Sequence, residues 1–168
     1  NYGAMKLASE GLITSNSDFF DCLFIFRFPN VVGADNTHGL IYDMIKKSKK
    51  FKKIPVLGNG LQKKPYIHVL DLINLIFNIY QNKKYNKFNI YNIGPEDKGI
   101  TVKSIISKLK KLDNFKNKNF IYQNKTIGWK GDIPKYSYDI SKLKKDFGVK
   151  IISSKKAIDK TISEIIKW

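Results

Sequence analysis

The chain of 168 residues has one cysteine and no long apolar run, and each scarcity excludes a class of protein. Cys22 has no second cysteine to pair with, so a disulfide framework within the chain is impossible and a reducing compartment such as the cytoplasm is expected. No stretch approaches the ~18 uninterrupted apolar residues of a membrane-spanning helix, so we expect no membrane segment. Cys22 lies inside an apolar segment, where a small buried hydrophobe is the expected role.

Arginine is as scarce as cysteine, although the chain is strongly basic. Lysine and arginine total 31 against 14 aspartates and glutamates, which gives a formal net charge of +17, yet Arg27 is the one arginine. Such a charge invites a nucleic-acid-binding interpretation. Arginine, however, is the side chain that usually reads bases and phosphates with two parallel hydrogen bonds. Specific nucleic-acid binding is therefore not expected, whereas an anionic small substrate gains from the same field.

The chain also lacks a glycine-rich phosphate loop. Its 11 glycines form no Gly-x-Gly-x-x-Gly or Gly-x-x-Gly-x-x-Gly stretch. Such a loop, placed between a strand and a helix, brings backbone N–H groups onto the pyrophosphate of a dinucleotide. The sequence likewise has no second histidine or cysteine at ligand spacing from His38, so no metal site is expected.

What the chain does contain predicts an α/β fold. Hydrophobic residues make up 42% and charged residues 27%, as is typical of a globular domain. Residues 22–28 are apolar on both faces apart from Arg27, which predicts a central parallel strand covered by helices. Asp71 is predicted to cap the helix that follows it, and Thr101 to cap a helix over residues 102–112.

The start of the chain carries a candidate acid/base pair. Small and helix-forming residues predict a helix from about residue 2 to residue 14, and side chains four apart on a helix lie on one face. Tyr2 and Lys6 therefore point the same way, and an ammonium beside a phenol favours the phenolate. A phenol that titrates near ~10 needs a pKa nearer ~7 to act as a general base at neutral pH. That shift exceeds what a lysine supplies alone, and a bound cationic cofactor ring would add to it.

The spacing of this pair is not diagnostic by itself. It recurs at three other places, where a solvated helix face or a loop is the preferred interpretation: Tyr42/Lys46, Tyr80/Lys84 and Tyr138/Lys142. The first pair differs in its context, because Gly3 and Ala4 keep the helix surface thin next to Tyr2. A flat ring could approach the phenol there.

Residues 2–10 (Tyr-Gly-Ala-Met-Lys-Leu-Ala-Ser-Glu) and 27–33 (Arg-Phe-Pro-Asn-Val-Val-Gly) resemble the extended short-chain dehydrogenases/reductases. Within them, the chain is similar to the NAD-dependent nucleotide-sugar epimerase/dehydratase family, and residues 58–72, 91–94 and 131–142 agree in order. The resemblance implies the C-terminal part of a Rossmann-type parallel-sheet domain plus a small α/β substrate-binding domain.

The resemblance also implies domain boundaries. Residues 1–33 and about 66–94 would be the last elements of the dinucleotide-binding domain, and residues 34–65 and about 95–168 the substrate-binding domain. The glycine-rich loop, and a Ser or Thr that assists the tyrosine, would lie upstream of Asn1. The chain is therefore expected to be the C-terminal half of such an enzyme.

The same resemblance assigns roles around the cofactor NAD. Tyr2 would be the catalytic acid/base, and Lys6 would lower its pKa and hold the cofactor ribose. The turn containing Pro29 and Val32 would meet the nicotinamide with its backbone. The amide of Asn30 would donate to the substrate diphosphate, a task for which its NH₂ group is suited.

Four further positions would bind the nucleotide sugar. His38, Leu40 and Leu57 correspond to the lining of the base and sugar pocket, although His38 can also be a plain loop histidine. Lys64 stands where the family usually has an arginine that contacts the nucleotide phosphate or ribose. Lysine retains the charge and loses the bidentate fork.

The resemblance implies epimerisation of a UDP-hexose at C4, through tyrosine-assisted hydride transfer to and from NAD. A 4,6-dehydratase or a reductase of the same family is the alternative, and so is a catalytically silent fragment. The partners implied are a nucleotide-sugar substrate and, in the full-length enzyme, a second copy that docks through helices including the catalytic one.

Overall fold

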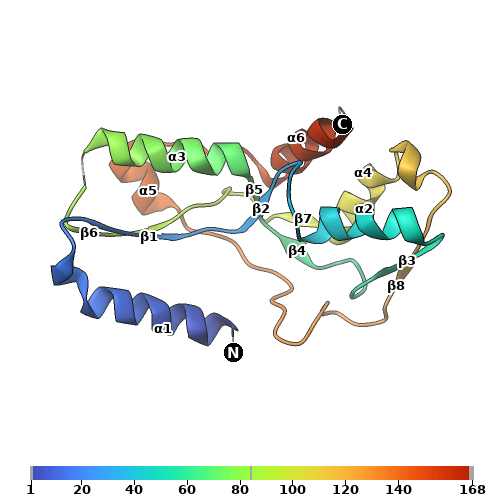
Figure 1. Ribbon diagram of the computed structural model, residues 1–168, viewed down its shortest axis with the longest axis horizontal. Helices are drawn as coiled ribbons and strands as arrows, with labels where there is room; N and C mark the ends of the chain where they lie inside the picture. Colours follow the sequence, from blue (N-terminus) through green and yellow to red (C-terminus); the bar gives the residue numbers. More distant parts are fainter. Residues whose placement is uncertain (1, 84, 167–168) are drawn as a thin grey trace.

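A computed structural model of the chain describes residues 2–83 and 85–166 (Figure 1). Helices and strands alternate along it, which confirms the predicted α/β class. The helices are α1 (Tyr2–Ser15), α2 (Leu40–Lys50), α3 (Val69–Asn82), α4 (Val102–Leu109), α5 (Ser141–Phe147) and α6 (Ser154–Ile166), with 3-10 turns η1 (Ser17–Phe19) and η2 (Asp113–Phe115). The strands are β1 (Leu23–Arg27), β2 (Asn30–Val32), β3 (Lys53–Val56), β4 (Lys63–Lys64), β5 (Tyr66–His68), β6 (Phe88–Asn92), β7 (Ile100–Thr101) and β8 (Asn119–Tyr122).

The strands form pairs, three of which are parallel. β1 pairs with β6, β2 with β5 and β3 with β8 in parallel, whereas β4 and β7 are antiparallel. Parallel neighbours need a crossover, and α3 supplies part of the crossover to β6. In the view of Figure 1, α3 lies above the β1–β6 pair and α1 lies below it.

The apolar side chains form two buried clusters. The first cluster joins β3, α2, α4 and α6: Val32, Ile41, Met44, Ile54, Val56, Tyr66, Ile100, Ile105, Ile106, Leu109, Phe115, Ala157, Ile158 and Ile162. The second cluster joins α3, β6 and α5: Ile67, Leu72, Leu75, Ile79, Tyr91, Ile93, Ile140 and Leu143. β5 contributes to both clusters, because successive side chains along a strand point to opposite faces. Its residue Tyr66 belongs to the first cluster, and the next residue, Ile67, belongs to the second.

The predicted strand at residues 22–28 forms as β1, but it is flanked on one side only. β1 pairs with β6 from Leu23 opposite Phe88 to Arg27 opposite Asn92. Its other edge has no partner strand within residues 2–83 and 85–166. Cys22 lies just before β1 and is partly rather than fully buried.

Of the two predicted caps, one is confirmed and one is wrong. The Thr101 hydroxyl accepts a hydrogen bond from the Ser104 N–H at 3.1 Å and caps α4. α3 begins before Asp71, because Nδ1 of His68 accepts the Leu70 N–H at 3.3 Å. Asp71 lies in the first turn of α3, where it pairs with a lysine of α6 and the positive end of the helix dipole favours its charge.

No helix in the described part of the chain is long and apolar enough to cross a membrane.

Candidate active site

Tyr2 and Lys6 lie one turn apart on α1, as predicted. The Lys6 ammonium lies 5.7 Å from the centroid of the Tyr2 ring, and the Tyr2 side chain is 70% exposed. The pair Tyr42 and Lys46 has the same geometry on α2, with 5.8 Å between ammonium and ring. The contact is thus a product of helical spacing, and what distinguishes Tyr2 is the surroundings of α1.

The turn after β1 carries three of the predicted ligand residues. Pro29 is buried, and the Val32 side chain belongs to the first cluster, so Val32 has only its backbone to offer a ligand. Asn30 is exposed, and its Nδ2 donates a hydrogen bond to the Tyr136 hydroxyl at 3.3 Å. The carboxyl end of β1 therefore presents an amide that a distant segment of the chain already contacts.

Two tyrosines that the sequence interpretation did not single out lie beside these residues. The rings of Tyr136 and Tyr138 meet edge to face with centroids 5.9 Å apart. Tyr138 packs on Gly94, where an added Cβ would come within 3.0 Å of the ring. Burial, together with the neighbouring phenols of Tyr136 and Tyr2, raises the pKa of Tyr138 to about 12. Tyr138 is therefore a neutral hydrogen-bond donor at physiological pH.

The sequence did contain a weak signal for Tyr138, namely its Tyr-x-x-x-Lys spacing with Lys142. That spacing does not produce a pair, because the Lys142 ammonium lies over the ring of Tyr91, 4.6 Å from its centroid. Residue 138 precedes α5 and is not helical, so the one-turn relation does not apply to it. Tyr136 had no local signal at all, since its partner Asn30 is 106 residues away.

Lys64 is held by the loop that follows β8. Its ammonium pairs with Asp132, whose side chain is 3% exposed. The other oxygen of Asp132 accepts the Gly128 N–H at 2.9 Å. Leu57 belongs to the same neighbourhood, because a Cβ on Gly128 would lie 3.6 Å from its side chain. Leu57 and Lys64 thus converge on the Gly128–Asp132 turn, and an anion at Lys64 has to share the ammonium with a buried carboxylate.

His38 and Leu40 lie at the start of α2. His38 is exposed, and its Nδ1 is 3.5 Å from the Thr37 hydroxyl. Leu40 packs against the first cluster with part of its surface exposed. Within the described residues, no hydrogen bond or ion pair joins His38 to the other predicted site residues, and no group of three His, Cys, Asp or Glu side chains is placed to hold a metal ion.

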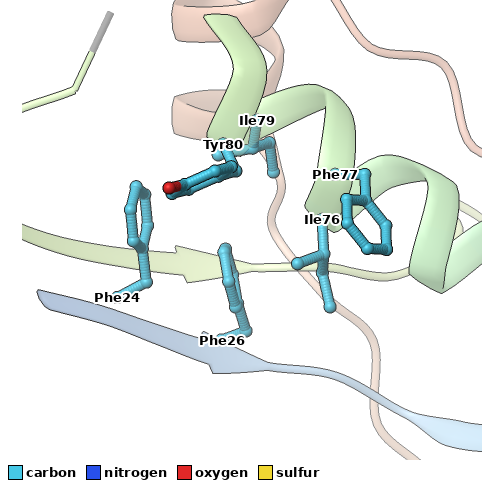
Figure 2. A pocket seen from close by; sticks show the side chains of 6 residues that line it. All are labelled: Phe24, Phe26, Ile76, Phe77, Ile79 and Tyr80. Atoms are coloured by element: carbon cyan, nitrogen blue, oxygen red, sulfur yellow. The ribbon is translucent and has the colours of Figure 1, made fainter. Parts of the chain in front are cut away.

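An apolar hollow of the surface lies elsewhere. Figure 2 shows six side chains that line it, two from β1 and four from α3: Phe24, Phe26, Ile76, Phe77, Ile79 and Tyr80. The Tyr80 hydroxyl is the one polar side-chain group among them, and the lining contains no lysine or amide side chain beside it. The candidate active site is instead the surface shared by α1, the turn after β1 and the Tyr136–Tyr138 segment.

Comparison with known proteins agrees with this fold. Residues 1–94 match the model of the NAD dependent epimerase/dehydratase family. No curated protein sequence matches significantly. Among solved structures, a UDP-galactose 4-epimerase is 25% identical with a TM-score of 0.76, and the match covers 99% of this chain and 53% of that one.

Two further structures share the fold. A UDP-glucuronic acid 4-epimerase from Bacillus cereus, in complex with UDP-glucuronic acid and NAD, is 22% identical with a TM-score of 0.78 over 99% of this chain and 52% of that one. TunA, an NAD-dependent NDP-hexosamine 5,6-dehydratase, is 17% identical with a TM-score of 0.66 over 86% of this chain and 46% of that one. The chain spans about half the length of the structures that it matches. It belongs to the NAD-dependent epimerase/dehydratase family.

Proposed function

We propose that the chain supplies the acid/base residues and the substrate site of an NAD-dependent nucleotide-sugar epimerase that acts on a UDP-hexose at C4. The observation that carries the proposal is the position of the Tyr2–Lys6 pair on α1. Tyr2 is near enough to Tyr138 to contribute to its raised pKa, and Tyr136, two residues before Tyr138, contacts Asn30 after the carboxyl end of β1. Ligands of open α/β sheets bind at this end of the strands. Membership in the NAD-dependent epimerase/dehydratase family supports the same reaction.

The residues of the chain fit one end of NAD. Tyr2 and Lys6 offer a hydroxyl and an ammonium on an exposed helix face, a donor set suited to ribose hydroxyls. The turn at Pro29 and Val32 offers backbone, because both side chains are buried. When bound, NAD supplies the acceptor and donor of the hydride. The sequence has no glycine-rich loop for the pyrophosphate, so we expect the chain alone to bind NAD weakly.

Each residue then has one task in the proposed reaction. Tyr2 takes the proton of the sugar 4-hydroxyl and returns it after the keto sugar has turned over, and Lys6 stabilises the phenolate by its charge. Asn30 donates to an oxygen of the substrate diphosphate. Lys64 offers the ammonium protons that Asp132 does not occupy to the nucleotide.

The proposal extends to the organisation of the protein. The first buried cluster supports a substrate-binding unit at residues 34–65 and 95–168, and the second supports a dinucleotide-binding unit at residues 1–33 and 66–94, with α5 packing on the latter. The exposed apolar side chains of α1 support dimerisation through this helix. The single cysteine supports a cytoplasmic location.

The test is an activity assay of the natural protein translated from the gene that encodes this chain (the translation product). NAD is supplied as cofactor and UDP-hexoses as substrates, and the product sugars are separated by chromatography. We expect Tyr2→Phe to lower kcat by a factor of about 100 or more, because the phenol moves the proton. Tyr42→Phe is the matched control, since Tyr42 has the same lysine contact on another helix. Equal activity of the two variants would contradict the assignment of Tyr2.

The products separate the alternatives. An epimer with unchanged mass supports the epimerase. A product lighter by one water identifies a dehydratase, for which the shared fold of TunA is the supporting observation. Absence of any product from the whole translation product identifies a catalytically silent protein. The purified chain of 168 residues is expected to be inactive by itself.

A further inference from the structure

The one arginine of the chain joins the candidate catalytic helix to the sheet. Arg27 ends β1, and its Nε donates to both carboxylate oxygens of Glu10 on α1, at 2.9 and 3.1 Å. Its Nη2 donates to one of the same oxygens. This is the fork geometry that a guanidinium can provide and a lysine ammonium cannot. The other basic side chains of this sequence, the histidines apart, are lysines. The one arginine therefore stands where two parallel hydrogen bonds are formed.

Little else holds α1 in place within the described part of the chain. None of its residues is buried. The side-chain hydrogen bonds that α1 makes with other elements all join Glu10 to Arg27. Figure 1 shows α1 running alongside β1 with no ribbon on its outer side. A contact of modest strength is therefore sufficient to decide how the helix is rotated and how far it is shifted along β1.

The pair lies on the face of α1 that carries the candidate acid/base residues. Tyr2, Lys6 and Glu10 follow one another at intervals of four residues, so they lie along one side of the helix. With a rise of 1.5 Å per residue, Glu10 is about 12 Å from Tyr2 along the axis. Rotation of α1 that removes Glu10 from Arg27 therefore also turns Tyr2 away from Tyr138 at the end of the sheet.

We propose that Glu10 and Arg27 form a positioning clamp that sets the rotation and register of α1 and so holds Tyr2 and Lys6 at the carboxyl end of β1. Arg27 also lies two residues before Pro29, so the clamp ties the acid/base helix to the turn that carries the predicted nicotinamide and diphosphate contacts. That the clamp serves catalysis by Tyr2 rests on the proposed function. That the clamp sets the rotation and register of α1 does not depend on that function.

The competing explanation is an ordinary surface ion pair. The two side chains are 46% and 23% exposed, and exposed pairs contribute little to global stability. Global unfolding therefore does not separate the two explanations. Local opening of α1 does, because a clamp protects the helix it holds and an ordinary pair leaves that helix as it was.

The first readout is amide hydrogen exchange of α1 in the chain. We expect Arg27→Lys, which retains the charge and loses the fork, to speed exchange in α1 about 3-fold or more, and Glu10→Gln to do the same. The exchanged pair Glu10→Arg with Arg27→Glu rebuilds the fork in the opposite direction and is expected to restore protection. Asp113→Asn, which breaks the surface pair with Lys116, is the matched control and leaves α1 unchanged.

The second readout is the titration of Tyr138 by NMR. Burial is the main cause of the raised pKa of Tyr138 and Tyr2 makes the smallest of three contributions, so release of α1 in Arg27→Lys is expected to lower that pKa slightly. Tyr91 is the internal control, because burial and Asp146 raise its pKa to about 12 without any contribution from α1. Wild-type exchange in α1, or an unchanged Tyr138 titration in both clamp variants, overturns the proposal.

Activity gives an independent third readout. In the active translation product, Arg27→Lys is expected to lower kcat and leave KM nearly unchanged, because a displaced acid/base group affects the transition state more than substrate binding. If no activity exists, the proposed function fails while exchange and titration still test the clamp. If activity exists and both clamp variants match the wild type in exchange of α1 or in the Tyr138 titration, the clamp fails alone.

Discussion

The part of the protein around β3 and β8 and the part around β1 differ in how far their apolar side chains are buried. Leu109 and the other members of the first cluster have helices or strands on all sides. Around β1, Leu7 on α1 is 68% exposed and Phe77 on α3 is 59% exposed. The apolar groove of Figure 2 opens between β1 and α3. The first part is therefore stabilised by its own contacts, whereas the second leaves apolar surface to solvent.

The largest expected effect tests this contrast with one substitution in each part. Leu109→Ala removes a fully buried side chain from the first cluster and is expected to lower the free energy of unfolding by ~2–5 kcal/mol. Leu7→Ala, on the exposed face of α1, is expected to change it by less than ~0.5 kcal/mol. Urea unfolding of both variants provides the measurement. Similar losses would show that α1 is buried in solution and that the contrast does not hold.

The next effect concerns a carboxylate that joins β7 to α6. Asp97 accepts hydrogen bonds from the Gly99 N–H at 2.6 Å, the Ser154 N–H at 2.6 Å and the Ser154 hydroxyl at 2.7 Å. Asp97→Ala leaves these donors unsatisfied and is expected to cost ~1–3 kcal/mol, measured by urea unfolding. A loss below that of Leu7→Ala would mean that the turn rearranges and that the first part of the protein is less rigid than its burial indicates.

A smaller effect appears at alkaline pH in the second cluster. Burial, together with the hydrogen bond to Asp146, raises the pKa of Tyr91 to about 12 from its ordinary value of 10. The folded state therefore holds this proton more tightly than the unfolded state, so the contribution to stability is complete below pH 10 and is lost as the pH rises to 12. The difference in unfolding free energy between wild type and Tyr91→Phe is expected to shrink over that interval. A difference that stays constant would show that Tyr91 titrates normally.

The smallest expected effect is that of an exposed pair in the well-packed part. Asp113 and Lys116 form an ion pair in which both side chains are mostly exposed. Asp113→Asn is expected to leave the unfolding free energy unchanged within the error of urea unfolding, because exposed pairs are screened by solvent. A measurable loss that persists in 1 M salt, where surface charges are screened, would indicate a packing role for Asp113.

Local sequence signals predicted several features correctly, because their causes lie within a few residues. The helix at the start of the chain forms as α1, Thr101 caps α4, and Tyr2 and Lys6 share a face. Asp71 was predicted wrongly for a related reason. His68, which caps α3, is hydrogen-bonded to Glu164, 96 residues away. No pattern in the local sequence predicts that partner.

The sequence by itself determined the α/β class and the family, and it supplied the residues proposed for the chemistry, since periodicity and motif spacing are local properties. Only the tertiary structure decided that Asn30 meets Tyr136 and that Lys64 meets Asp132, because these partners are 106 and 68 residues apart. The same holds for Arg27 and Glu10. Their ion pair forms where β1 returns alongside α1, an arrangement that no local pattern in either element shows.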